Sequence, residues 1–165
     1  MTPQTLRHTL APVFDVHSRV LILGSFPSPK SRETGFYYGN PQNRFWPVMA
    51  VLWSEPVPPT PAERRAFALR HGIALWDVVA SCSIEGADDG SIRNVSVNPL
   101  DIILSQADIA AIFTCGGKAS SLYKKYCLPV TGRAAISLPS TSPANCRRSL
   151  ASLVDAYHIV RDYTG

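Results

Sequence analysis

A chain of 165 residues, 45% of them hydrophobic, has the size of one ordinary globular domain whose core needs no metal ion or disulfide. No apolar run reaches membrane-spanning length, and the first residues lack the charged and apolar regions of a signal peptide. We therefore expect a single domain over residues 1–165 that is soluble, cytoplasmic and monomeric, without a membrane partner. The net charge of +4 favours a polyanionic partner only weakly.

The cysteines and histidines fall into no metal-ligand spacing. The four cysteines show no CxxC pair, which is typical of free thiols in a reducing compartment. The four histidines are equally scattered. We predict no metal and no cofactor.

Charge is distributed unevenly along the chain. From Lys118 to Arg148 every charged residue is basic, whereas acids outnumber bases between Trp53 and Asp108. One basic end and one acidic end suit a face that binds a polyanion, although basic runs are also common as plain solvated surface. Both interpretations stay open on charge alone.

The first half of the chain is organised around one long loop. Residues 1–19 predict an arm or short helix that carries no chemistry. A buried strand, Val20–Leu23, then breaks at Gly24 into a loop rich in Ser, Pro, Gly and Asn, and this loop leads into a helix over Arg44–Trp53. A long loop at the carboxyl end of a strand is more often a binding or catalytic loop than a plain connection.

The rest of the chain alternates strands and helices. In chain order we predict a helix over Thr60–His71, a strand over Ile73–Val79, a surface loop with a helical turn over Ser81–Ser96, a helix from Asn98 to near Ser105, a strand over Ile109–Thr114, a helix from Gly116 to near Tyr126, a strand over Ala134–Leu138 and a terminal helix to near Asp162. Ser142 is the predicted N-cap of that last helix, with Pro143 at its first position. The pattern predicts a three-layer α/β/α sandwich around a mainly parallel four-stranded sheet, with ligands bound beyond the carboxyl ends of the strands.

Two segments carry a family resemblance that covers most of the chain. The segment Gly24–Ser28 (GSFPS), followed by Tyr38–Trp46 (YGNPQNRFW), resembles the first motif region of the uracil-DNA glycosylase superfamily, and Leu138–Asn145 (LPSTSPAN) resembles its second. The closest likeness is to the hypoxanthine-DNA (deoxyinosine) glycosylase branch. The resemblance implies a monofunctional DNA repair glycosylase, which flips a deaminated base out of damaged DNA and hydrolyses its N-glycosidic bond to leave an abasic site.

The resemblance also implies roles for the first motif region. Gly24, Ser25, Phe26 and Pro27 would form the base pocket, and Tyr38 would stack on the flipped base. Alternatively, the aromatics at 36–38 simply cover the sheet.

Three polar residues are candidates for chemistry and base reading. The amides of Asn43 and Asn40 are the catalytic candidates, since an amide can both donate and accept; Asn43 is equally placed to cap a helix. Asp77 falls where the superfamily commonly reads the base with Asn, and a carboxylate suits a base that presents an N–H. It could also cap a turn.

The second motif region and the basic run supply the candidates for DNA binding. Ser142 would offer a phosphate the free N–H groups of a helix N-terminus, and the two arginines that follow would add charge-assisted contacts. The full set of predicted DNA contacts is Ser140, Thr141, Ser142, Arg147, Arg148 and Lys118.

Two departures from the family pattern bear on the substrate. Efficient uracil-DNA glycosylases carry an acidic residue where this chain has Phe26, and a histidine where it has Leu138. Loss of a general base costs on the order of 10²–10⁴ in rate. Strong uracil activity is therefore not expected and hypoxanthine is favoured, while the ranking of hypoxanthine, uracil and xanthine stays open.

Two rival interpretations remain at this level. A non-catalytic binder of damaged or single-stranded nucleic acid would explain the missing acid and histidine, although the retained asparagines argue against it. A hydrolase or nucleotide-binding enzyme built on Gly24-Ser25 lacks the GxSxG elbow and the glycine-rich phosphate motifs.

Overall fold

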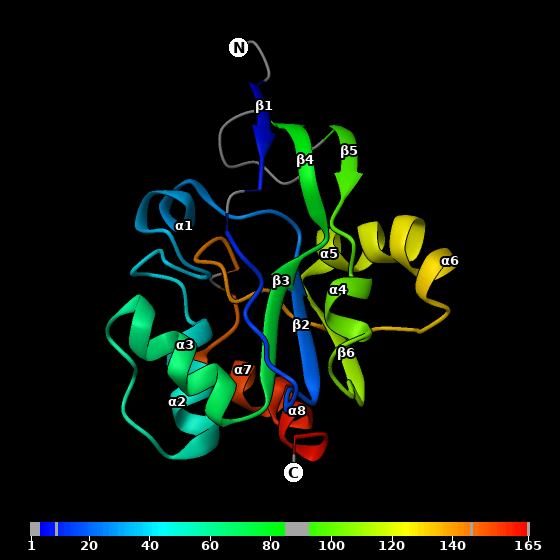
Figure 1. The fold of residues 1–165 in the computed structure, drawn as a ribbon. Helices are drawn as coiled ribbons and strands as arrows, with labels where there is room; N and C mark the ends of the chain where they lie inside the picture. Colours follow the sequence, from blue (N-terminus) through cyan, green and yellow to red (C-terminus); the bar gives the residue numbers. More distant parts are fainter. Residues whose placement is uncertain (1–3, 9, 85–92, 146, 165) are drawn as a thin grey trace.

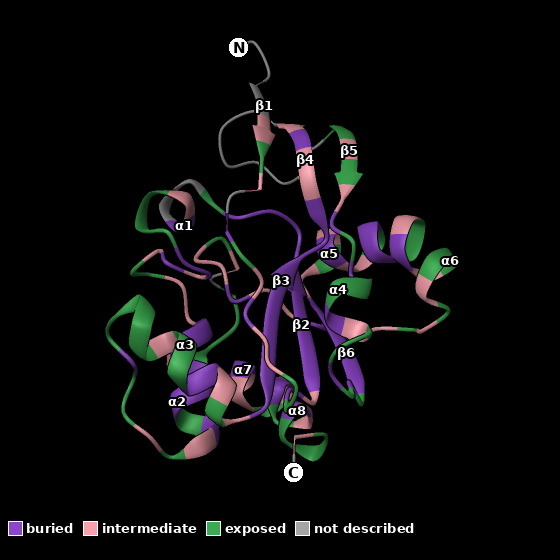
Figure 2. Ribbon diagram, viewed as in Figure 1, coloured by how far each residue is buried: buried purple, intermediate pink, exposed green. Residues whose placement is uncertain are grey.

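Four parallel strands form the centre of the protein, whose computed structural model describes residues 4–8, 10–84, 93–145 and 147–164. The strands are β2 (Val20–Gly24), β3 (Ile73–Asp77), β6 (Ala111–Cys115) and β7 (Ile136–Leu138), in the order β3-β2-β6-β7. Every residue of β2 and β3 is buried (Figure 2). Burial on both faces explains why these strands read as continuous apolar runs.

Helices lie on both sides of this sheet (Figure 1). On one side are α2 (Phe45–Trp53) and α3 (Pro61–Arg70), and on the other are α4 (Asp101–Leu104), α5 (Gly117–Leu122) and α6 (Leu128–Thr131). A π-helical segment, Tyr123–Cys127, joins α5 to α6, so this helical region extends past the predicted end. The chain closes with α7 (Leu150–Tyr157), which packs on α2, and α8 (Ile159–Asp162). The predicted α/β fold with a parallel four-stranded sheet is confirmed. No helix in the described ranges is long and apolar enough to cross a membrane.

A second, antiparallel sheet corrects two sequence predictions. It contains β1 (Gln4–Arg7), β4 (Val79–Ile84) and β5 (Arg93–Val97) in the order β1-β4-β5 (Figure 1). The prediction of an arm or short helix before residue 20 missed β1, and the loop predicted over 81–96 missed β4 and β5; residues 85–92 of that loop lie outside the described residues. When one face of a strand is exposed to solvent, only alternate side chains are apolar, so such a strand looks polar in the sequence.

The structure also differs from the sequence predictions by one additional helix and by the start of another. The long loop contains a short helix, α1 (Pro29–Thr34), which Ser28 caps by accepting the Ser31 N–H. The terminal helix begins at Leu150 with Ser149 as its N-cap, so the prediction that Ser142 caps it was wrong. The Ser142 hydroxyl instead accepts the Ala144 N–H within a turn, at 3.2 Å. Serine favours such local turns for the same reason that it favours caps, and the sequence alone does not separate the two.

Candidate active site

The carboxyl ends of the four parallel strands bring the two motif regions to one edge of the sheet. Gly24, at the end of β2, is the register partner of Asp77, at the end of β3. On the other side, Cys115 of β6 is the partner of Leu138 of β7. Two candidate residues, Gly24 and Asp77, and the second-motif residue Leu138 are distant in sequence but end strands of one sheet, at the edge where ligands bind in α/β folds.

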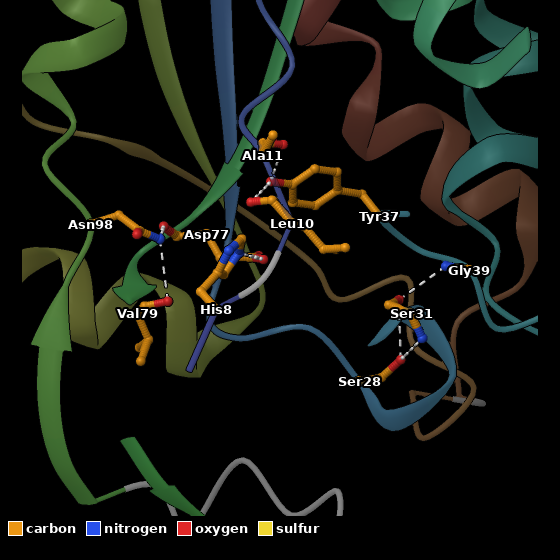
Figure 3. Close-up of polar contacts among 10 residues, drawn as sticks. All are labelled: His8, Leu10, Ala11, Ser28, Ser31, Tyr37, Gly39, Asp77, Val79 and Asn98. Atoms are coloured by element: carbon orange, nitrogen blue, oxygen red, sulfur yellow. Dashed lines mark hydrogen bonds and ion pairs between the residues drawn. The ribbon is translucent and has the colours of Figure 1, made fainter. Parts of the chain in front are cut away.

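Asp77 holds a buried carboxylate with an unexpected partner. Its Oδ2 lies 2.8 Å from Nε2 of His8, and the two side chains are only 6% and 3% exposed (Figure 3). An ionised carboxylate only accepts hydrogen bonds, so the Nε2 of His8 carries the hydrogen and donates. Sequence analysis missed His8, since 69 residues separate it from Asp77 and no local pattern marks it.

Gly24 is a glycine because the Asp77 carboxylate occupies the space of a side chain. A Cβ at this position would lie 2.4 Å from Oδ1 of Asp77 and 3.7 Å from the hydroxyl of Tyr38. The pocket residues expected from the first motif, Gly24 to Pro27, are all buried. The backbone at the start of this segment is held by Val78, the residue between β3 and β4, whose N–H donates to the Gly24 carbonyl at 2.8 Å.

Asn98 is a second residue that sequence analysis did not assign to the site. Its buried amide donates to the carbonyls of Asp77 at 2.9 Å and Val79 at 3.2 Å (Figure 3). Its own N–H donates to the carbonyl of Val78 at 2.8 Å. One side chain thus holds the short segment that carries the chain from the parallel sheet into β4, and with it the backbone of Asp77.

Tyr38, the predicted stacking residue, packs against Phe45 and contacts Cys115. Its backbone takes a left-handed conformation, with φ of 55°, and its ring stacks on Phe45 with centroids 3.9 Å apart. Its hydroxyl donates to Sγ of Cys115 at 3.7 Å. Burial raises the pKa of Tyr38 well above its usual value and that of Cys115 to about 11, so both keep their protons at neutral pH.

These contacts refine the stacking prediction. Phe45 covers one face of the Tyr38 ring, so a flipped base can use only the opposite face. The neighbouring Phe36 and Tyr37 are buried, and the Tyr37 hydroxyl donates to the Ala11 carbonyl at 2.9 Å. For Phe36 and Tyr37 the structure therefore favours the alternative interpretation, in which the rings cover the sheet rather than stack on a base.

The two catalytic candidates lie in one turn ahead of α2. Asn43 N–H donates to the Asn40 carbonyl at 2.9 Å. The side-chain oxygen of Asn40 accepts from the Gln42 N–H, and that of Asn43 accepts from the Phe45 N–H, each at 2.9 Å. The N-cap residue of α2 is Arg44, which makes no side-chain cap bond, so Asn43 is not the helix cap but closes a turn onto the first helical N–H, that of Phe45. Each side-chain oxygen has a second lone pair, and each amide group has two N–H donors, so these turn contacts leave chemistry possible.

The two positions that depart from the family pattern are apolar in space as well as in sequence. Phe26 is 8% exposed, and its ring meets the His8 ring edge-on with centroids 6.0 Å apart. Leu138 is 4% exposed and offers only its carbonyl, which accepts from the Gly116 N–H at 2.8 Å. Neither side chain can activate water or donate to a leaving base.

An open groove of about 840 Å³ runs beside the second motif. Its lining includes Gly116, Ser140, Ser142, Asn145 and Arg148. Of the six predicted DNA contacts, the structure therefore gathers Ser140, Ser142 and Arg148 here.

The other three predicted DNA contacts are not in the groove lining. Thr141 is buried, Lys118 is half-buried on α5, and Arg147 is exposed next to the groove residue Arg148. The predicted helix N-terminus at Ser142 is absent, because the helix begins at Leu150. The predicted phosphate contact would therefore have to come from side chains and loop N–H groups.

Arg44 joins the two motif regions. Its backbone N–H donates to the carbonyl of Thr141 at 3.1 Å. Its guanidinium donates to the carbonyl of Asn145 at 2.7 Å and to the carbonyl of Arg148. The residue that follows the catalytic candidates thus fixes the loop that lines the groove.

Comparison with known proteins decides the family. The model of the uracil DNA glycosylase superfamily matches residues 11–161. The chain belongs to this superfamily. It is 35% identical to a hypoxanthine DNA glycosylase of Methanosarcina barkeri over 86% of this chain and 89% of the relative. It is 33% identical to a hypoxanthine DNA glycosylase of Methanosarcina acetivorans, over 83% and 87% of the two chains.

A solved structure supports the same assignment. A solution NMR structure from Methanosarcina acetivorans, described as a candidate uracil DNA glycosylase, superposes with a TM-score of 0.78 at 28% identity, over 95% of this chain and 99% of that one. The expectation of a DNA repair glycosylase is confirmed, and a non-catalytic binder is not favoured. The roles of the individual residues remain predictions.

Proposed function

We propose that this superfamily member releases hypoxanthine from DNA that contains deoxyinosine. Both curated relatives named above are hypoxanthine DNA glycosylases, and together they match more than four fifths of the chain. Within the structure, one observation carries the proposal. The carboxylate of Asp77, at the end of β3, is buried and lies against Gly24, at the end of β2.

Asp77 suits hypoxanthine because of what each partner offers. Hypoxanthine presents N1–H on its pairing edge, and an ionised carboxylate only accepts. Adenine presents a lone pair at N1 instead, which would face the carboxylate oxygen without a hydrogen. A buried polar contact of this kind discriminates strongly, since the wrong base leaves a buried group unpaired.

The reaction must proceed without a strong general base. Cleavage passes through an oxocarbenium-like sugar and a departing purine anion, and water then adds to the sugar. Asn43 can hold that water with the second lone pair of its side-chain oxygen, and its amide N–H groups can donate to the base. An amide orients rather than deprotonates, so the proposed rate comes mainly from positioning.

DNA binding would use the groove beside the second motif. Ser140 and Ser142 offer hydroxyl groups and Arg148 offers a positive charge to a phosphate. The groove adjoins the base pocket, because Leu138 ends the strand beside Cys115, which the hydroxyl of Tyr38 contacts. A strand held in the groove would present its flipped nucleotide to the pocket.

A base-release panel tests the proposal. Duplexes with one deoxyinosine, deoxyuridine or deoxyxanthosine, each opposite alternative partners, are incubated with excess protein, and abasic sites are detected by alkaline cleavage. We expect hypoxanthine to be released fastest. Faster release of uracil, or gel-shift binding without any abasic site, would contradict the proposal.

Asp77→Asn tests the base-reading step with little change in shape. We expect hypoxanthine release to fall at least about tenfold, as for one lost transition-state contact. The matched control is Asp108→Asn, since Asp108 is exposed and pairs with Arg19. An equal fall in both variants would argue against a specific role for Asp77.

A further inference from the structure

We propose that His8 is a positioning residue of the base pocket, which fixes the Asp77 carboxylate as a hydrogen-bond acceptor and so restricts excision to bases with an N–H on the pairing edge. The inference rests on the proposed function, since it concerns how Asp77 selects the base. It gives the N-terminal strand a role in specificity.

The second sheet places His8 beside Asp77. Strand β1 pairs with β4 in a register that sets Leu6 opposite Cys82 and Arg7 opposite Ser81. The pairing continues one residue further, because His8 N–H donates to the Ala80 carbonyl at 2.6 Å. Since β4 begins two residues after Asp77, this register sets His8 beside the carboxylate.

The imidazole of His8 is confined between aromatic rings. Phe26 meets it edge-on at 6.0 Å, and Tyr37 lies tilted at 6.1 Å between centroids. Tyr37 also shares its one hydroxyl hydrogen between the carbonyls of Leu10 and Ala11, which holds these two residues against the Tyr37 ring (Figure 3). A ring with 3% of its side chain exposed and walls on two sides presents its Nε2 in one direction.

The two oxygens of Asp77 therefore have separate tasks. Oδ2 receives the His8 hydrogen bond, and Oδ1 lies against Gly24, on the side of the Tyr38 hydroxyl. Without His8 the carboxylate could rotate and turn Oδ1 away from the N1–H of hypoxanthine. An accepting Oδ1 has no hydrogen for adenine, whose N1 is a lone pair. His8 thus keeps in place the group that distinguishes hypoxanthine from adenine.

The test is a double-mutant cycle between His8 and Asp77. His8→Ala, His8→Gln, Asp77→Asn and the double variant His8→Ala/Asp77→Asn are compared with wild type under single-turnover conditions. The substrates are two duplexes that differ only by deoxyinosine or deoxyadenosine at one position. Thermal unfolding of each variant is measured in parallel, and His17→Ala serves as the control because His17 is exposed.

We expect His8→Ala to lower hypoxanthine release about tenfold or more and to raise the ratio of adenine to hypoxanthine release. His8→Gln should recover most of the loss, since its amide also donates. In the Asp77→Asn background His8→Ala should change the rate by less than about twofold, because coupled residues are not additive.

Independent, multiplicative effects of the two substitutions would overturn the inference, as would unchanged base selectivity in His8→Ala at a temperature where it is folded. Failure of the proposed function looks different. If the wild type releases another base, the cycle is run on that base, and coupling between His8 and Asp77 still decides the positioning role. If no base is released, the cycle is read from gel-shift affinities for the deoxyinosine and deoxyadenosine duplexes.

Discussion

Gly24→Ala tests the geometry of the base pocket most directly. The new Cβ would lie 2.4 Å from Oδ1 of Asp77, and the carboxylate must recede by about 0.6 Å to reach the 3.0 Å limit that real Cβ atoms keep. The carboxylate has little room, since it is buried and already bonded to His8 at 2.8 Å.

The cost follows from what such a displacement breaks. A hydrogen bond to a charged group contributes about 1.5–3 kcal/mol. We therefore expect Gly24→Ala to destabilise the fold by about 2 kcal/mol, or about 4–8 °C in melting temperature for a domain of this size. Because a misplacement of about 1 Å can cost on the order of 100-fold in rate, hypoxanthine release should fall by about that factor.

The assays are thermal unfolding and single-turnover release of hypoxanthine, each also run in an Asp77→Ala background. Removing the carboxylate removes the clash, so Gly24→Ala should then cost less than about 0.5 kcal/mol. An equal loss of stability in both backgrounds would place the clash elsewhere. Wild-type activity in Gly24→Ala would refute the assignment of Oδ1 to the pocket.

Three further predictions concern other parts of the site. Asn43→Ala should lose at least about tenfold in rate and about 1 kcal/mol of stability, whereas Asn43→Ser, which keeps a side-chain oxygen that can accept the Phe45 N–H, should lose the rate alone; single-turnover assays and melting curves separate the two. Arg148→Ala should weaken DNA binding in gel shifts and reduce the salt slope by about 1, with a smaller effect for Arg147→Ala; equal affinity at low and high salt would contradict this. Because burial raises the pKa of Cys115 from 9.0 to about 11, the fold should lose stability as pH rises through this range, and Cys115→Ser should flatten the fall seen in melting temperature.

The parallel sheet was predictable because its strands leave a strong local signal. β2 and β3 are buried on both faces, so all five residues of β2 and the first four of β3 are apolar or small, and the polar residue Asp77 ends β3. The same signal located Asp77, since a polar side chain directly after such a run lies at the ligand edge of the sheet. The candidate pocket thus followed from local pattern and family motif together.

What the sequence did not reveal depends on contacts between distant segments. β1 and β5 are short and partly exposed, so their pairing depends on β4 rather than on their own composition. The contact between His8 and Asp77 spans 69 residues and follows from that pairing. The start of the last helix was predicted wrongly for a different reason. The hydroxyl of Ser142 accepts a hydrogen bond within a turn, whereas the sequence equally allows Ser142 to cap a helix.

The apolar residues at the two departures from the family pattern explain why such remote contacts matter. Phe26 and Leu138 stand where efficient uracil-DNA glycosylases carry an acid and a histidine, so these two positions offer no group that would act on water or base directly. On the proposed function the rate therefore comes from placement of water, base and sugar, which tolerates little movement. Each pocket element is accordingly held from elsewhere in the chain: Asp77 by His8 and by Asn98, and the groove loop by Arg44. Substitutions at these supporting residues should therefore reduce activity about as much as those at the asparagines, although none of the three is proposed to touch the base.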